Sequence, residues 1–233
     1  MSDRFQRNIR RCNILLLFCA AACLVCYDIH GGLWLKGVTS SCFVLLGFVN
    51  LWCGWKTRVP NFRFVILVET GLFFGMCADV LLGIQFYLGV AFFALGHLLY
   101  LAAFYLLEKP SPRDLMYILP ISVVTIYLIT GTSFIQIHDP MMQKLLIGYG
   151  IIISGMLGKA ISNITVSRSL SRWLILVGAA LFWFSDLILA IDMFGQSSRI
   201  TWILCSYTYW PAQNILAHSL LPFIREQLSE RVV

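Results

Sequence analysis

Hydrophobic residues form eight long runs along the chain, and short polar segments separate one run from the next. A helix of about 20 largely apolar residues is long enough to cross the hydrocarbon core of a bilayer. The pattern therefore predicts eight membrane-spanning helices. We expect them over residues 13–29, 33–53, 64–84, 86–107, 115–136, 141–163, 173–194 and 200–224.

Two of the predicted breaks between spans depend on very few residues. His30, Gly31 and Gly32 separate the first span from the second, and Gln85 stands between the third and the fourth. The other breaks contain prolines, charges or several polar residues. If either short break were absent, every later span would run in the opposite direction.

Charged residues make up 12% of the chain, whereas soluble domains contain about 25%. This small number of charges cannot cover a water-facing surface, and the bilayer must therefore solvate most of the chain. Eight spans also leave room only for short loops and tails. We therefore expect an all-α, polytopic helix bundle that forms a single transmembrane domain over residues 1–233.

The 17 lysines and arginines are distributed unequally between the two sides that eight spans define. Fourteen fall on the side of the two termini, if Lys159 is counted with the loop after the sixth span, and only Lys36, Lys144 and Arg199 fall on the other. Positive residues mark the cytoplasmic side, which predicts that both termini are cytoplasmic. The net charge of +6 is thus a signal of topology. Basic tracts with interleaved aromatic residues, as on nucleic-acid surfaces, are absent, so we expect no nucleic-acid partner.

Ionisable residues inside the predicted spans are candidates for function, because a charged side chain at mid-bilayer costs several kcal/mol. They are Lys36, Glu69, Asp79, His97, Asp186, Asp192 and His218, and Tyr100, Tyr209 and Gln213 join them as polar residues. At 1.5 Å of rise per residue, Asp79 lies about 7 Å, Asp186 about 12 Å, Tyr209 about 14 Å and His97 about 16 Å below the outer ends of their spans. Lys36 begins its span near the same surface. We expect these residues to form one layer in the outer half of the membrane.

Two aspartates in one layer suggest acid–base chemistry. Two carboxylates that meet in a medium of low dielectric constant favour a state in which one keeps its proton, which gives a general acid beside a carboxylate base. Either aspartate alone has a plain structural interpretation as a hydrogen-bond partner, and His97, Tyr209 and Gln213 have one as contacts between helices. Histidines at metal-binding spacing and a nucleophile-elbow motif are absent from the sequence, so we expect no metal and no cofactor.

Four segments carry a resemblance to a known family. Gly75–Leu82 and Gly89–Tyr100, and later Gly178–Ala190 and Tyr209–Gln213, resemble the YhhN-like family of membrane proteins in residues, order and spacing. Lys36 fits the family pattern as well. The sequence departs from that pattern at Ala78, where the family usually has glycine, and at Gly37, where it commonly has proline.

This resemblance implies an enzyme of ether-lipid turnover. Characterised family members are lysoplasmalogenases, which hydrolyse the vinyl ether bond of lysoplasmalogens to a fatty aldehyde and glycerophosphocholine or glycerophosphoethanolamine. The resemblance implies a lysophospholipid substrate, with Asp79 and Asp186 as acid and base in an order the sequence leaves open. Its supporting residues would be Lys36 near the phosphate, with His97, Tyr100, Ser185, Tyr209 and Gln213.

Two other functions fit the same residues. One is a lipid or small-molecule transporter that uses its buried aspartates as a proton relay, and the other is a lysolipid-binding protein without activity. Transporters often contain inverted repeats, and the halves of this chain echo each other weakly, with an aspartate in the third and seventh spans. The short loops favour a bacterial inner membrane over an endoplasmic reticulum as the location.

Overall fold

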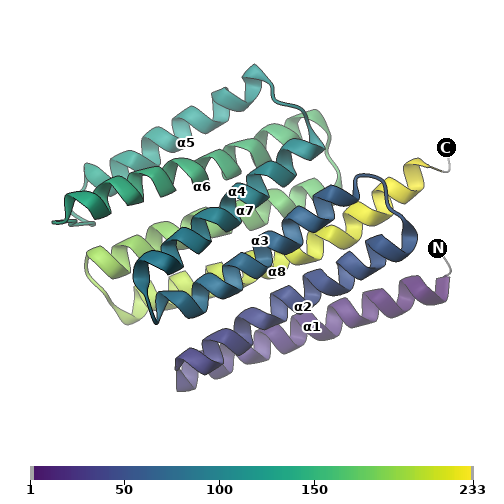
Figure 1. Cartoon of the computed structure of the whole chain (residues 1–233), viewed down its shortest axis with the longest axis horizontal. Helices are drawn as coiled ribbons and strands as arrows, with labels where there is room; N and C mark the ends of the chain where they lie inside the picture. The colour runs from purple at the N-terminus through teal and green to yellow at the C-terminus, as the bar shows by residue number, and fades with distance from the viewer. Residues whose placement is uncertain (1–2, 232–233) are drawn as a thin grey trace.

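A computed structural model describes residues 3–231 as a bundle of helices. The helices are α1 (Asp3–His30), α2 (Leu33–Thr57), α3 (Phe62–Leu82), α4 (Phe86–Leu107), α5 (Pro112–Thr130), α6 (Pro140–Val166), α7 (Leu170–Phe194) and α8 (Arg199–Glu230). They run roughly side by side along one axis (Figure 1). The prediction of an all-α bundle of eight helices is confirmed, and the described residues contain no strand.

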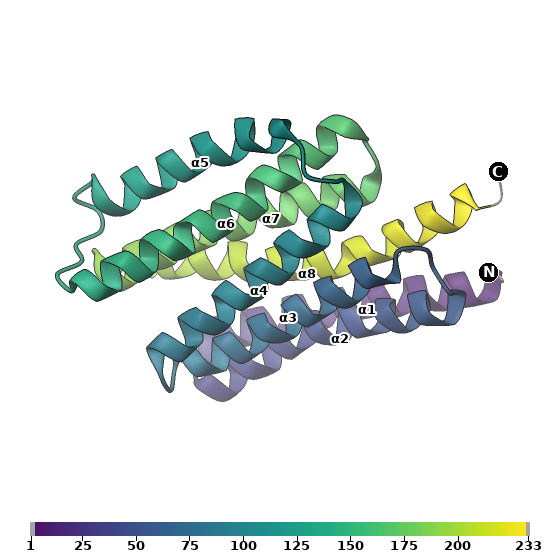
Figure 2. The same ribbon diagram turned by 45° about the horizontal axis from the view of Figure 1, so that its top comes forward.

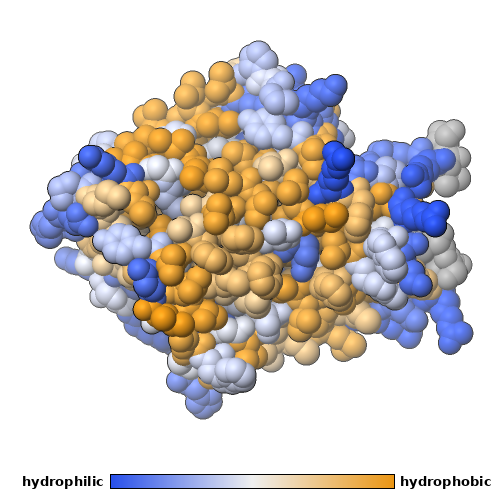
Figure 3. Space-filling view, viewed as in Figure 1, coloured by the Kyte–Doolittle hydropathy of each residue, from blue (hydrophilic) through white to orange (hydrophobic). Residues whose placement is uncertain are grey.

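Seven of the helices, α1 to α7, are long and apolar enough to cross a membrane. Helix α8 is longer than any of them but contains no stretch as apolar as theirs. It packs against α1, α2, α3 and α7, so its polar residues Ser206, Gln213 and Ser219 are buried by protein instead of facing lipid. The visible face of the bundle has a wide hydrophobic band with hydrophilic residues at both ends (Figure 3). The chain is an integral, multi-pass membrane protein.

Both described ends of the chain lie at the same end of the bundle (Figure 1), as an even number of passes requires. Which end faces the cytoplasm stays a prediction from the charge pattern. One of the lysines in that pattern is not a loop residue, because Lys159 lies within α6 and is fully buried. Its ammonium donates to both carboxylate oxygens of Asp114, at 3.0 and 3.1 Å. This charge is neutralised inside the bundle.

The two breaks that rested on few residues are confirmed. Gly31 and Gly32 have φ angles of 65° and 92°, a backbone conformation that glycine adopts without strain. Gln85 caps α4, since its side-chain carbonyl accepts a hydrogen bond from the Leu88 amide at 2.7 Å. Each break is therefore built by local chemistry in spite of its short length.

The fifth span ends earlier in the structure than the sequence predicted. Helix α5 ends at Thr130 instead of residue 136, and residues 131–139 connect it to α6 without a regular element. This segment packs against the end of α7, where the Gln136 amide donates to the Phe194 carbonyl at 2.8 Å. Ile135 of this loop is buried against protein, so it continues the hydrophobic run without continuing the helix.

The two halves of the chain repeat one packing scheme. Helix α2 packs on α8 as α6 packs on α4, and α3 packs on α4 as α7 packs on α8. Helices α1 to α3 form one group and α5 to α7 another, with α4 and α8 between them (Figure 2). Because α1 and α5 begin at the same end of the bundle (Figure 1), the repeat is parallel and not inverted. It places Asp79 on α3 and Asp186 on α7 at corresponding positions.

Candidate active site

Two adjoining cavities lie where the start of α2, the ends of α3 and α7 and the starts of α4 and α8 meet, and the larger one extends to α5 and α6. The larger has a volume of about 400 Å³ and is lined mainly by apolar side chains, among them Leu82, Phe86, Leu146, Ile153 and Phe194. The smaller has a volume of about 90 Å³ and is lined by a more polar set that includes Asp79, Asp192, Ser206 and Tyr209. Lys36 and Asp186 line both cavities. The site thus has an apolar and a polar compartment with charged residues at their junction.

Asp79 is buried, with 2% of its surface exposed, and is surrounded by donors. Ser40 Oγ donates to its Oδ2 at 2.5 Å, and the Tyr209 hydroxyl donates to the same oxygen at 2.7 Å. The Lys36 ammonium lies 3.6 Å from Oδ1. The cation and the two hydroxyl donors favour the ionised form of this carboxyl group, whereas its burial favours the neutral form.

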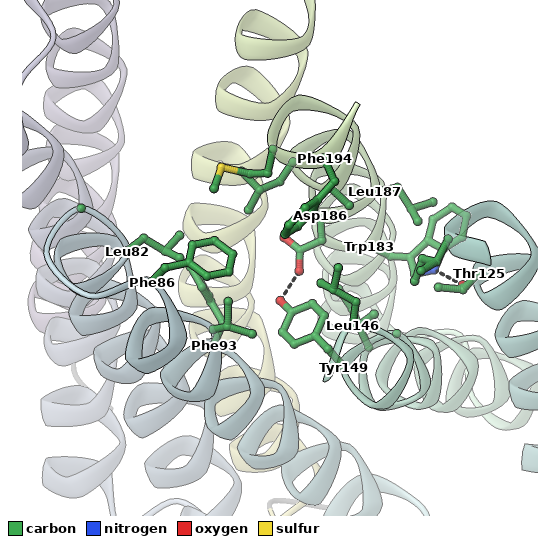
Figure 4. A pocket seen from close by; sticks show the side chains of 18 of the residues that line it. Leu82, Phe86, Phe93, Thr125, Leu146, Tyr149, Trp183, Asp186, Leu187 and Phe194 are labelled. Carbon is green, nitrogen blue, oxygen red and sulfur yellow. Dashed lines mark hydrogen bonds between the residues drawn. The ribbon is translucent and has the colours of Figure 1, made fainter. Parts of the chain in front are cut away.

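Asp186 has a different set of neighbours. The Tyr149 hydroxyl donates to Asp186 Oδ2 (Figure 4). His97 Nε2 lies 2.8 Å from the Tyr149 hydroxyl oxygen and 3.2 Å from the same aspartate oxygen. With the tyrosine proton on its bond to Asp186, Nε2 acts as a donor toward both oxygens. Asp186 is therefore paired with a tyrosine and a histidine, whereas Asp79 has a lysine.

A buried chain of hydrogen bonds leads from Asp79 into the bundle. Beyond the Tyr209 hydroxyl, Gln213 donates to that hydroxyl from Nε2 at 3.4 Å, and Tyr100 donates to Gln213 Oε1 at 2.7 Å. Gly75 makes room for the amide, because a Cβ atom there would lie 2.5 Å from Gln213 Nε2. These groups fix the orientation of Tyr209, and through it that of Asp79.

The far wall of the apolar cavity contains a polar contact between helices. Trp183 Nε1 on α7 donates to Thr125 Oγ1 on α5 at 2.9 Å (Figure 4). Ser154 Oγ on α6 donates to the same hydroxyl oxygen at 2.9 Å. The indole is thereby held with its ring against the cavity.

Comparison with known proteins assigns the chain to a family. The sequence model of the YhhN family matches residues 33–220. The chain belongs to the YhhN family. It is 34% identical over 137 residues to lysoplasmalogenase TMEM86B of Rattus norvegicus, which covers 58% of this chain and 52% of that protein. It is 27% identical over 223 residues to lysoplasmalogenase TMEM86B of Mus musculus, covering 94% of this chain and 90% of that protein. In its alignment with the rat relative, the chain spans about half of that protein's length. No solved structure matches the chain.

All eight site residues expected from the sequence lie within the region matched by the YhhN model, and the structure divides seven of them into two groups. Lys36, Asp79, Asp186 and Tyr209 line the small cavity. His97, Tyr100 and Gln213 are buried behind it and contact the first group by hydrogen bonds. Ser185 stands apart, because its hydroxyl donates to the Phe182 carbonyl at 2.7 Å and is 3.4 Å from Asp186 Oδ1.

Three further residues of the YhhN region belong to the site and were not expected from the sequence. Ser40 and Tyr149 each donate to a site aspartate, and Trp210 Nε1 donates to Ser40 Oγ at 3.1 Å. Ser40 follows Lys36 by four residues and so shares its helix face, which is a signal that the sequence contains. For Tyr149 the signal in the sequence is weaker, since it is only the polar residue of the run Gly148–Gly150 in the sixth span. Within residues 3–231, no group of three or more histidine, cysteine or acidic side chains is arranged to hold a metal.

Proposed function

We propose that this protein hydrolyses the vinyl ether bond of lysoplasmalogens within the membrane. The rat and mouse relatives are both named lysoplasmalogenases, and the mouse alignment extends over 94% of this chain. The substrate class is therefore a single-chain phospholipid. Hydrolysis releases a fatty aldehyde and a glycerophosphocholine or glycerophosphoethanolamine.

One observation carries the proposal, which is that Asp186 lies at the junction of an apolar and a polar cavity. In a lysoplasmalogen the vinyl ether joins the hydrocarbon chain to the glycerol phosphate. A lipid with its chain in the apolar cavity and its glycerol in the polar cavity presents that bond at the junction. Lys36 lines both cavities and would meet the phosphate as a charge partner.

The neighbours of the two aspartates suggest their roles. We assign Asp79 as the ionised carboxylate, because the Lys36 ammonium lies 3.6 Å away and two hydroxyl groups donate to it. We assign Asp186 as the protonated acid, because its partners are Tyr149 and His97 and no lysine or arginine among the described residues pairs with it. One lysine, one carboxylate and one carboxylic acid give no net charge, which suits a site in a membrane interior.

The reaction needs only proton transfers and one water. Asp186 gives its proton to the alkene carbon distal to the ether oxygen, and the double-bond electrons form that C–H bond, which leaves an oxocarbenium ion. Water adds to the cationic carbon and gives a proton to Asp79, whose carboxylate also stabilises the cation. In the collapse of the hemiacetal, its hydroxyl proton passes to Asp186 and the glycerol oxygen receives the proton of Asp79. Aldehyde and alcohol leave, and both carboxyl groups are restored.

The surrounding hydroxyl groups support these steps. Once Asp186 has given up its proton, Tyr149 and His97 stabilise its carboxylate as donors that are already in place. Tyr209 and Ser40 do the same for Asp79. Tyr100 and Gln213 act through Tyr209 as positioning residues.

The direct test measures aldehyde release by the purified protein in detergent, with a coupled aldehyde dehydrogenase. We expect turnover of a lysoplasmalogen and its loss in Asp79→Asn and Asp186→Asn. Glu69→Gln is the matched control, because it also converts a buried carboxyl of α3 to an amide but lies ten residues, about 15 Å, from Asp79. Full activity in either folded aspartate variant would refute the assigned pair. Lipid or proton flux in proteoliposomes without any turnover would favour a transporter instead, and release of fatty acid from an ester-linked lysolipid would indicate a different hydrolase.

A further inference from the structure

The small cavity has a second wall that the proposed reaction does not use. Beyond Asp79 and Asp186 it is lined by Tyr27 of α1, Asp192 of α7, and Trp202 and Trp210 of α8. Trp202, Ser206 and Tyr209 follow one another at intervals of four and three residues, so one face of α8 points along the cavity. This wall therefore continues from the proposed reaction centre toward the end of the bundle.

Three aromatic rings form most of this wall. The centroid of Tyr27 lies 5.7 Å from that of Trp202 and 5.1 Å from that of Trp210, with the latter pair nearly edge to face at 64°. The Trp202 ring already attracts a cation from within the chain, since the Arg199 guanidinium carbon lies 4.5 Å from its centroid. Aromatic rings grouped in this way bind quaternary ammonium groups by cation–π attraction.

Asp192 adds a negative charge beside the rings. Its Oδ1 accepts hydrogen bonds from Ser197 Oγ at 2.9 Å and from the Thr201 hydroxyl. These two bonds fix the side chain, and the described residues give its Oδ2 no hydrogen bond. One carboxylate oxygen is thus held in place and the other is available to a cation in the cavity.

The spacing of these groups matches the order of groups in a lysophospholipid. Asp192 follows Asp186 by six residues of the same helix, which is about 9 Å along its axis. Lys36, the cation for a phosphate, reaches the level of Asp79. The ammonium of Lys36 thus lies at the level of the carboxyl groups, and Trp202, which precedes Tyr209 by seven residues or about 10 Å of helix, lies further out together with Asp192.

We propose that Tyr27, Trp202 and Asp192 bind the positively charged end of the substrate headgroup and favour choline over ethanolamine. The inference rests on the proposed function, whose substrate it specifies. A trimethylammonium group has no N–H donors and is bound through its methyl groups by ring faces and one negative charge. A primary ammonium group is bound best by several hydrogen-bond acceptors, and among the described residues this wall offers one charged oxygen, that of Asp192, beside the hydroxyl groups of Tyr27 and Ser206.

Binding can be tested apart from turnover with a lipid that the enzyme cannot cleave. The probe is a radiolabelled lysolipid with a saturated ether-linked chain and a phosphocholine headgroup, measured on the purified protein in detergent. The comparison probes have the same chain and carry either phosphoethanolamine or phosphoglycerol, the latter without a cation. We expect the wild-type protein to bind the choline probe most tightly.

Trp202→Ala and Asp192→Asn should each weaken binding of the choline probe by about 3- to 30-fold and leave the phosphoglycerol probe unchanged. Trp202→Phe should retain most of the affinity because it keeps a ring. Trp34→Ala is the matched control, since Trp34 lies near the same end of the bundle but is 81% exposed and lines neither cavity.

An equal loss for the choline and phosphoglycerol probes, or no loss for either, would overturn the headgroup site. Turnover of lysoplasmalogen by a protein whose binding ignores the headgroup would refute this inference and leave the proposed function standing. Selective binding of the choline probe without any turnover would refute the proposed function and leave the headgroup site standing.

Discussion

Replacement of Tyr149 by phenylalanine tests the proposed role of Asp186 through a residue that does not itself exchange a proton. The change removes one hydroxyl, which donates to Asp186 Oδ2 and lies 2.8 Å from His97 Nε2. The ring stays in the wall of the apolar cavity, so the cavity keeps its shape. His97 Nε2 also stays 3.2 Å from the aspartate, and Asp186 keeps one of its two donors.

The size of the effect follows from the charge that develops. The Tyr149 bond is strongest when Asp186 is ionised, which in the proposed reaction happens as the proton reaches carbon. A hydrogen bond to a charged group contributes about 1.5–3 kcal/mol, and each 1.36 kcal/mol of barrier is a factor of ten in rate. We therefore expect kcat to fall by about 10- to 160-fold in Tyr149→Phe, with little change in KM.

The assay is aldehyde release over a range of lysoplasmalogen concentrations, so that kcat and KM are obtained separately. Tyr127→Phe serves as the control, because Tyr127 on α5 is 62% exposed and contacts neither aspartate. A folded Tyr149→Phe protein with a kcat within twofold of wild type would refute the reasoning. So would a change confined to KM, which would make Tyr149 a binding residue.

Three other predictions follow from single contacts. Lys36→Met removes the cation 3.6 Å from Asp79 and should lower kcat/KM for lysoplasmalogen by about tenfold or more. Lys36→Arg keeps the charge and should retain part of the wild-type kcat/KM, so equal activity of the two variants would argue against a role for the charge. Gly75→Ala places a Cβ atom 2.5 Å from Gln213 Nε2 and should lower both the free energy of unfolding, by about 1–3 kcal/mol, and the rate of turnover. Gly155→Ala is the control, because its Cβ would meet Leu101 at an ordinary 3.6 Å and should change neither the stability nor the rate. Asp114→Asn leaves the buried Lys159 ammonium without its carboxylate and should destabilise the protein by about 3–5 kcal/mol in a detergent unfolding assay. The double variant with Lys159→Met should recover much of that loss, whereas additive losses would show that the pair is not coupled.

Candidate site residues can be found from the sequence to the extent that burying them is costly. An aspartate inside a span must face the protein interior because lipid cannot solvate it, so hydropathy and charge alone place Asp79 and Asp186 inside the bundle. Hydroxyl residues give no such signal. Thr70, for example, donates to the Ile66 carbonyl of its own helix at 2.8 Å and needs no partner elsewhere. Ser40 is of the same kind in the sequence, and only its position beside Asp79 distinguishes it.

Helix α8 shows the same limit for the fold. It contains no stretch as apolar as those of α1 to α7, and the apolar run over residues 200–224 predicted a helix without indicating what surrounds it. Contacts with α1, α2, α3 and α7 bury its polar side chains. A one-dimensional pattern records how polar a residue is, whereas its environment depends on helices distant in sequence.

The sequence by itself determined the helices, their alternating direction and the burial of the two aspartates in the bundle, because hydrophobicity and charge act on each segment locally. It also contained the repeat of an aspartate in each half, although too weakly to establish it. Only the tertiary structure decided which donors meet which aspartate, with lysine and serine at Asp79 and tyrosine and histidine at Asp186. The physical reason is that the two halves pack by the same scheme but place different side chains at corresponding positions, and the resulting difference in local charge depends on distances of a few ångströms between separate helices.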